Sequence, residues 1–203
     1  MITTRAIVLA TGLVDLLPPI PGLHESWGKD AHVCPCFSGY EVQDKRLVVF
    51  GLPERLPQSG KFLTAWSPYV TVVTSHEFEP VVNERLHKLG VVVVRDEVSA
   101  LVRRDDRLIA VSTDGGKTIP CDGVFISAAM RAASNLAATL CEVDETGFAV
   151  VDPNGKTSRA GVWAIGNASD PLSHLIHAAA AGAQAGPWIN DYLIDLSLVT
   201  IKN

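Results

Sequence analysis

Short runs of apolar residues recur along the chain and alternate with more polar stretches. A wholly apolar run of about four to eight residues predicts a strand that is buried on both faces, which is typical of parallel sheets. Longer segments with helical spacing lie between several of these runs. The strands are expected at 6–10, 46–51, 69–74, 91–95, 123–127, 148–151 and 161–167, and the helices at 54–66, 78–90 and 173–195.

Turn residues refine this alternating pattern. The segments 99–104 and 107–113 flank Asp105-Asp106, and this arrangement predicts an antiparallel hairpin. Strands that alternate with helices indicate α/β layers. We therefore expect an α/β protein with two lobes of three-layer, nucleotide-binding-like architecture, built on parallel sheets plus a small antiparallel β element.

Composition narrows the class of protein. The chain has 203 residues, 47% of them hydrophobic, and a formal net charge of −5. We expect no nucleic-acid partner, because no long basic run is present. We expect no membrane association, because no apolar run reaches the roughly 18 residues of a membrane-spanning helix. The start of the chain does not have the pattern of a secretory leader, so a cytoplasmic location is expected.

Three segments carry a resemblance to a known family. They are TTRAIVLATG at 3–12, HVCPCFSGYEV at 32–42 and GVWAIGNASDPLSHLIHAAAAGAQA at 161–185. Together they resemble thioredoxin reductases and related small-molecule dithiol oxidases, which are pyridine nucleotide-disulfide oxidoreductase flavoproteins. The resemblance implies that 1–28 and 122–203 are a remnant of the FAD-binding domain. It also implies a pyridine-nucleotide-domain-like lobe at 29–121, and a homodimer.

The FAD cradle of that family is the first departure. Such a cradle needs a strand, a glycine-rich turn and a helix, so that backbone amides can reach the pyrophosphate. No G-x-G-x-x-G pattern precedes Thr11, so the first FAD-cradling βαβ unit is expected to be missing. If flavin is bound, the resemblance implies contacts from a set of later residues. These are Thr11, Gly12, Gly166, Asn167 and Ala168.

The second nucleotide site also departs from the family. Only Gly51 fits the glycine-rich turn after the second strand, and Pro53 and Leu56 stand where the second and third glycines would be. Proline removes a backbone N–H donor. Glu77 and Glu79 follow the next strand and would repel a 2′-phosphate. NADPH binding is not expected.

The cysteine pair is the third departure. The family has Cys-x-x-Cys, which places Cys34 at its first cysteine and Phe37 at its second, with Cys36 one position early. A redox or nucleophilic pair and an inactive pair both remain open. His32, Cys34 and Cys36 have the spacing of soft metal ligands. No fourth ligand is evident nearby, so no metal is expected.

Two further polar residues complete the candidate catalytic set. His177 lies three residues after His174, on one face of the last helix. Histidine titrates near neutral pH, so His177 is either a general base or a surface residue at the start of the helix. Tyr40 follows the cysteine segment. The candidate catalytic residues are Cys34, Cys36, His32, His177 and Tyr40.

The leading hypothesis is a fold that has lost self-sufficient FAD and NADPH chemistry. Its vacated inter-lobe cleft would bind or transform an apolar small molecule without a hydride step, by cyclase- or isomerase-type acid–base chemistry or conformer positioning. No cofactor is then expected. A second hypothesis is a residual thiol–disulfide oxidoreductase, with FAD bound only if another chain completes the site. A third is a non-catalytic partner subunit.

Overall fold

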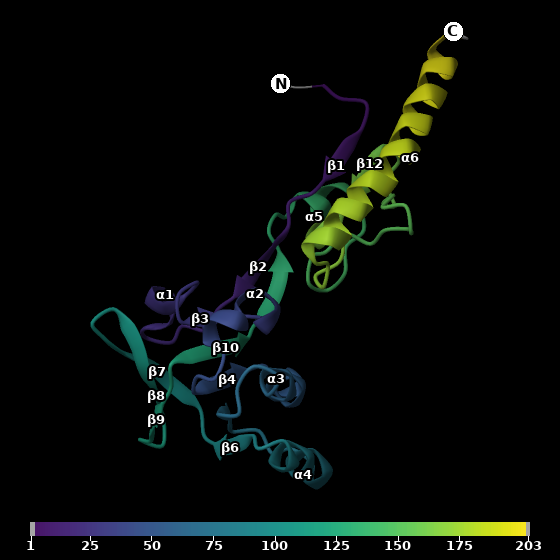
Figure 1. Cartoon of the computed structure of the whole chain (residues 1–203). Coiled ribbons are helices and arrows are strands. Elements are labelled where there is room, and N and C mark those ends of the chain that lie inside the picture. The colour runs from purple at the N-terminus through teal and green to yellow at the C-terminus, as the bar shows by residue number, and fades with distance from the viewer. Residues whose placement is uncertain (1–2, 202–203) are drawn as a thin grey trace. The chain divides into compact units, whose positions relative to one another are not determined.

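The computed structural model describes residues 3–201, which fold into two compact units. One unit is the continuous segment Leu17–Ala129, and the other joins the two ends of the chain, up to Leu16 and from Met130 onward (Figure 1). These borders differ from the expected ones at 28/29 and 121/122. The reason is packing, because Leu17 and Ile20 contact the core of the continuous unit, and 123–127 is a strand of its main sheet.

The continuous unit is built on a five-stranded parallel sheet. Its strand order is β3-β10-β4-β5-β6. Every residue of β10 is buried, as are the first four of β4. Because strands buried on both faces need apolar side chains, both sequences are largely apolar. The strands are β3 Ala31–His32, β10 Gly123–Ser127, β4 Leu47–Gly51, β5 Val70–Thr74 and β6 Val92–Arg95.

Helices cover one face of this sheet. A short 3₁₀ turn, η2 (Pro53–Arg55), leads into α3 (Leu56–Leu63), and α4 (Pro80–Lys88) lies beside it. The side chains of both helices pack on the sheet in one apolar cluster that includes Leu56, Leu86 and Phe125. Figure 1 shows both helices on the same side of β4 and β6.

An antiparallel sheet covers the other face and completes three layers. It consists of β7 (Val98–Arg104), β8 (Arg107–Thr113) and β9 (Thr118–Pro120). Its apolar side chains pack against the parallel sheet in a second cluster, which also holds the short helix α1 (Leu23–Ser26) through Leu23. The expected hairpin and the small antiparallel element are therefore confirmed.

A partly buried ion pair joins this hairpin to the cysteine segment. Asp30, just before β3, accepts hydrogen bonds from Arg103 Nη1 and from the Leu108 amide, each at 3.1 Å. The Arg103 side chain is 14% exposed and that of Asp30 24%. This contact fixes where β3 begins, and hence where the cysteines lie.

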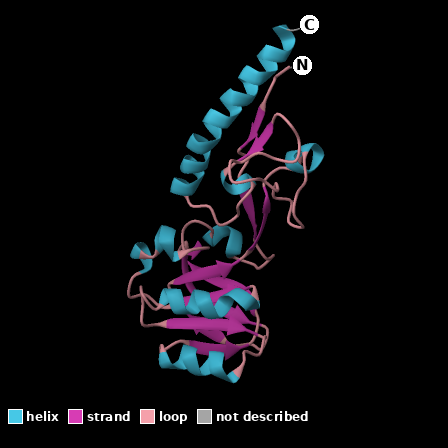
Figure 2. Cartoon of the chain, turned by 90° about the vertical axis from the view of Figure 1, so that its right-hand side faces the viewer, coloured by secondary structure: helices cyan, strands magenta, loops and turns pink. Residues whose placement is uncertain are grey.

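The discontinuous unit contains two small pairs of strands. β1 (Ile7–Leu9) lies parallel to β12 (Val162–Ala164), and β2 (Leu13–Leu16) pairs with β11 (Ala129–Ala132). Beside them are the short α5 (Leu136–Leu140) and the long α6 (Leu175–Ile201), which Figure 2 shows as a single extended helix. Trp163 of β12 packs edge-on against Tyr192 of α6, with ring centroids 5.3 Å apart.

Two expected elements differ from the structure. Residues 148–151 form isolated bridges at Ala149 and Val151 rather than a strand. The strand expected at 161–167 ends at Ala164, because Gly166 has a φ of 57° and turns the chain into a 3₁₀ turn, η3 (Gly166–Ala168). Among the helices of the described chain, none combines the length and hydrophobicity that crossing a bilayer requires.

Candidate functional site

Cys34 and Cys36 form a disulfide at the start of the short helix α2 (Pro35–Ser38). Cys34 is the N-cap residue of this helix, and its Sγ accepts a hydrogen bond from the Cys36 amide at 3.3 Å. Cys36 is exposed and Cys34 half-buried. A thiol in solution can therefore reach Cys36 first.

An apolar hollow lies beside this disulfide. Its volume is about 170 Å³, and Cys34 contributes to its wall. The wall comes from the cysteine segment, from α3 and from the ends of β4 and β10. The lining residues are Val33, Cys34, Pro35, Val49, Ser59, Phe62, Leu63, Phe125, Ile126 and Ser127.

His32 lies on β3, directly before the cysteine segment. Its ring packs against Phe125 with centroids 5.4 Å apart, and its Nε2 is buried without a hydrogen-bond partner. Burial lowers the pKa of His32, and the nearby carboxylates of Asp30 and Glu41 oppose this effect more weakly. Burial therefore favours the neutral form of the imidazole.

Tyr40 begins a 3₁₀ turn, η1 (Tyr40–Val42), shortly after the cysteines. Its side chain is 79% exposed, and that of Phe37 is 72% exposed. His32, Cys34, Cys36 and Tyr40 thus lie within one short stretch of one unit.

His177 lies in the other unit, in the first turn of α6. Its Nδ1 accepts a hydrogen bond from the His174 amide at 3.2 Å, and the two exposed rings are 5.7 Å apart. The ring thus helps to cap the helix. Its grouping with the cysteines stays a prediction.

The residues at the pyridine-nucleotide turn do not fit a dinucleotide. Gly51 has a φ of +120°, and a Cβ there would lie 2.4 Å from the Ser127 carbonyl oxygen, so this glycine serves the packing of β4 on β10. Pro53 and Pro57 have no amide hydrogen to offer a phosphate. Leu56 has no exposed surface and belongs to the core.

Carboxylates occupy the end of β5, where the ribose of a dinucleotide would lie. Ser75 Oγ donates to Glu97, and Arg95 pairs with Glu77 at 3.6 Å. These groups oppose a 2′-phosphate, because the nearby arginine is already paired with a carboxylate. Neither the turn after β4 nor the end of β5 therefore offers the groups that would hold NADPH.

The turns named for flavin lie side by side. Leu9 of β1 is paired with Ala164 of β12, so the two parallel strands end together, and Thr11-Gly12 and Gly166–Ala168 follow them. Gly12 has a φ of +76°, and a Cβ there would meet no atom within 4 Å. Asn167 Nδ2 donates to the carbonyls of Asp170 and Ser173, each at 3.0 Å.

These residues fit one side of a flavin site. Gly12 leaves open space beside an exposed turn, and the carboxyl ends of parallel strands are where dinucleotides bind in α/β folds. A bound flavin would supply two-electron transfer to a disulfide. Thr11 and Gly12 are the residues that would lie against it, because Gly166 and Ala168 are buried and Asn167 already holds its own loop.

Metal binding has little support in the described part of the chain. Within residues 3–201, no three His, Cys, Asp or Glu side chains are grouped as a metal site would need. Cys34 and Cys36 are joined to each other, which leaves neither as a thiolate ligand in this state.

The sequence analysis missed most of the wall of the hollow. Ser59 and Phe62 come from α3 and Ser127 from the end of β10, so only the fold brings them to Cys34. One signal was present in the sequence. Ser127 is the last residue of a buried strand, and the carboxyl ends of parallel strands meet at one edge of a sheet.

Comparison with known proteins identifies the class to which this fold and disulfide belong. Residues 64–185, more than half of the chain, match the family model described as pyridine nucleotide-disulphide oxidoreductase. The chain therefore belongs to the pyridine nucleotide-disulfide oxidoreductases.

Two of the similar proteins are named thioredoxin reductases. The thioredoxin reductase of Listeria innocua is 26% identical, over 95% of this chain and 64% of its own length. The crystal structure of HlmI is 35% identical with a TM-score of 0.89, over 98% of this chain and 63% of HlmI. The thioredoxin reductase TrxB of Bacillus anthracis, described as putative, is 26% identical with a TM-score of 0.84, over 95% of this chain and 66% of that one. The chain thus spans just under two thirds of the length of these proteins.

Proposed function

We propose that this chain is a thioredoxin-reductase-like protein that does not run the NADPH-to-flavin-to-disulfide relay on its own, and that exchanges thiols with an apolar small molecule at Cys34–Cys36. The observation that carries the proposal is the position of the disulfide. Cys36 is open to solvent, while Cys34 lines an apolar hollow of about 170 Å³.

The loss of the relay follows from the pyridine-nucleotide turn. Two prolines and a core leucine stand where backbone amides would hold a pyrophosphate, as described above for Pro53, Pro57 and Leu56. Without that site, the chain has no route by which NADPH could deliver a hydride. Electrons would enter or leave through thiols.

The exchange step conserves atoms and electrons. A substrate thiolate attacks Cys36 Sγ, forms a mixed disulfide and releases the Cys34 thiolate. The second substrate thiolate then attacks the substrate sulfur of the mixed disulfide and releases the Cys36 thiolate. The substrate leaves as a disulfide, and the two protons of its thiols pass to Cys34 and Cys36.

Local contacts support Cys34 as the first leaving group. Its sulfur already accepts a hydrogen bond from the Cys36 amide, and such a bond stabilises a thiolate more than a thiol. The hollow beside Cys34 would hold the apolar body of the substrate.

Repeated turnover requires that the dithiol be oxidised again. Flavin is an oxidant of the required class, and the open turn at Thr11-Gly12, beside the buried Gly166–Ala168 turn, would form one side of a site for it. We therefore propose that a second chain, another copy or a different protein, completes the flavin site. A homodimer is one such arrangement.

The proposal is tested by single-turnover thiol exchange. The oxidised protein is mixed anaerobically with 1,2-benzenedimethanethiol, an apolar dithiol that can close a six-membered cyclic disulfide, and the cysteines are then alkylated and counted by mass spectrometry. We expect one dithiol consumed per chain, and no reaction in Cys34→Ser or Cys36→Ser. Cys141→Ser is the matched control, since Cys141 is a free, half-buried thiol outside the site.

Two results would count against this function. Failure of the oxidised protein to accept electrons from the dithiol would exclude exchange at this disulfide. Oxidation of NADPH by this chain alone, with FAD and a disulfide present, would show that the relay is intact.

A second candidate is a transformation without electron transfer. The observation that favours it is His32, whose Nε2 is buried without a hydrogen-bond partner and whose pKa is lowered by burial. Such a nitrogen can accept or donate a proton in cyclase- or isomerase-type chemistry on an apolar ligand. Activity on a substrate that survives Cys34→Ser and is lost in His32→Asn would favour this candidate over thiol exchange.

A further inference from the structure

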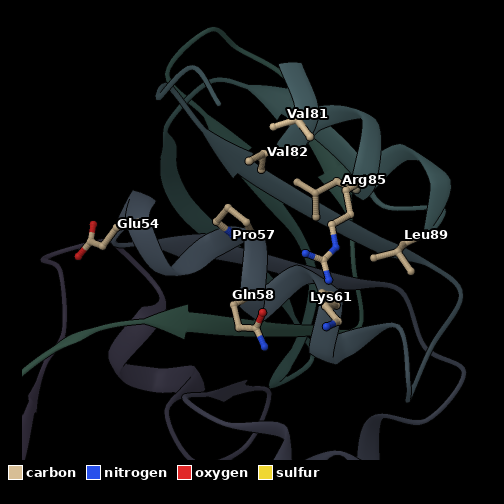
Figure 3. Close-up of a pocket in the computed structure, with 9 residues that line it drawn as sticks. Glu54, Pro57, Gln58, Lys61, Val81, Val82, Arg85 and Leu89 are labelled. Atoms are coloured by element: carbon tan, nitrogen blue, oxygen red, sulfur yellow. The ribbon is translucent and has the colours of Figure 1, made fainter. Parts of the chain in front are cut away.

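A second hollow lies between α3 and α4, apart from the disulfide. Its volume is about 260 Å³, somewhat below the roughly 300–1,000 Å³ of sites for drug-sized ligands. We call it the α3–α4 groove. It is lined by Glu54, Pro57, Gln58, Lys61, Val81, Val82, Arg85, Leu86 and Leu89 (Figure 3).

Helix α3 separates this groove from the hollow at Cys34. Ser59, Phe62 and Leu63 line the hollow, whereas Pro57, Gln58 and Lys61 line the groove. At about 3.6 residues per turn, the first set is centred on one side of α3 and the second set on another. The groove is therefore a separate site and shares no lining residue with the hollow.

The floor of the groove is apolar. Leu86 is 1% exposed and closes the bottom, while Val81 is 66% exposed and Leu89 39%. Pro57 and Val82 add further apolar surface. An apolar group placed there would remove exposed valine and leucine surface from water, which is favourable.

Two cations face each other above this floor. Figure 3 shows the Arg85 guanidinium directed from α4 toward the Lys61 and Gln58 side chains of α3, while the Glu54 carboxylate points away from the groove. Among the residues that the structure describes, neither Lys61 nor Arg85 takes part in a hydrogen bond or ion pair of its side chain. By contrast, Lys88 on α4 pairs with Glu84 at 2.7 Å.

We propose that the α3–α4 groove binds a small amphipathic carboxylate. Its apolar tail lies on Val81, Val82 and Leu89, and its carboxylate lies between Lys61 and Arg85. Arginine presents a planar fork of donors that matches a carboxylate, and lysine adds a second positive charge. Gln58 offers an amide donor beside them. An anion at this place also relieves the repulsion between two like charges.

A purely structural explanation for the two cations exists and is tested in the same experiment. Lys61 and Arg85 both lie in the last turn of their helices, where a positive charge stabilises the helix dipole. That explanation predicts that their removal lowers thermal stability without changing the affinity for an anion. The two explanations therefore differ in the binding measurement.

Hexanoate is the probe, titrated into the 203-residue chain and followed by the methyl signals of its valine and leucine residues in NMR spectra. We expect the methyls of Val81, Val82 and Leu89 to shift together. Acetate, which lacks the tail, and hexanamide, which lacks the charge, should each bind about tenfold more weakly or worse. Variants Arg85→Gln and Lys61→Gln should each weaken hexanoate binding about five- to tenfold.

Lys88→Gln is the matched control, because Lys88 is a cation on the same helix that is paired outside the groove. Its affinity for hexanoate should change less than about twofold. The proposal is overturned if hexanoate and hexanamide bind equally, if Arg85→Gln and Lys61→Gln keep full affinity, or if the groove methyls do not shift. Cys34→Ser should bind hexanoate normally. Failure of carboxylate binding in the groove can therefore be distinguished from failure of thiol exchange at the disulfide.

Discussion

Replacing Leu56 tests whether the glycine cradle for NADPH could be regained. Leu56 stands where the family has its third glycine, yet it has no exposed surface and packs in the cluster beneath α3. Truncating a fully buried leucine to alanine costs about 2–5 kcal/mol, with the larger values where the surroundings cannot collapse. Neighbours such as Val49 and Phe125 lie on hydrogen-bonded central strands, so we expect a loss of about 3 kcal/mol or more for Leu56→Ala.

Glycine at this position should be slightly worse. It removes one further buried carbon and increases the backbone freedom of the unfolded chain, together about 1 kcal/mol. The free energy of unfolding is measured by urea titration with far-ultraviolet circular dichroism. Leu52→Ala, a half-buried leucine in the same turn, is the matched control and should lose less than Leu56→Ala.

The double variant Pro53→Gly/Leu56→Gly completes this test. It restores both glycines, but Pro57 still lacks an amide hydrogen and Glu77 still faces the ribose position, so we expect no NADPH binding by fluorescence titration. The reasoning fails if this variant unfolds with less than about 1 kcal/mol of lost stability. It also fails if the variant binds NADPH at micromolar concentration.

Three further predictions follow from single positions. Gly51→Ala should lose at least about 2 kcal/mol of unfolding free energy in urea, because its Cβ would lie 2.4 Å from the Ser127 carbonyl oxygen; a neutral substitution would contradict this packing. Burial lowers the pKa of folded His32, so unfolding takes up a proton. The free energy of unfolding should therefore fall as the pH drops below about 6.5. His32→Asn should lose part of this pH dependence, as measured by urea titrations at pH 5.5 and 7.5. Burial raises the pKa of Cys121 to about 12, so in the native protein at pH 8 iodoacetamide should label Cys141 and leave Cys121 unmodified, as read by mass spectrometry.

The central strands could be predicted from the sequence because strands that are buried on both faces consist almost entirely of apolar residues. β4 and β10 are apolar at almost every position, and the structure places both inside the parallel sheet. The hairpin of β7 and β8 was equally clear, since Asp105 and Asp106 adopt the positive φ angles that its tight turn requires.

Other elements have no such apolar pattern in the sequence. β2 alternates half-buried and exposed residues and contains Asp15, and β3 has only two residues. Residues 148–151 are apolar, but Phe148 and Ala149 are buried beside a loop rather than in a ladder. Local sequence does not distinguish these cases, because the neighbours that decide them come from distant parts of the chain.

The sites divide in the same way. Cys34, Cys36 and His32 are adjacent in sequence, so the disulfide region could be named in advance. The walls of the hollow and of the α3–α4 groove could not, because Ser127 reaches Cys34, and Arg85 faces Lys61, only after the strands have taken their order in the sheet. Leu56 could be recognised as a lost glycine, but only its burial shows why the change is hard to reverse.

The pairing of β1 with β12 has a consequence for biosynthesis. β1 is translated before the segment Leu17–Ala129, yet its partner strand around Trp163 is made only after that whole segment. That intervening segment has its own core and can fold while β1 is still unpaired with β12. The turns at Gly12 and Gly166 can therefore come together only after β12 has been made, so a ligand held by both turns would bind after the continuous unit has been translated.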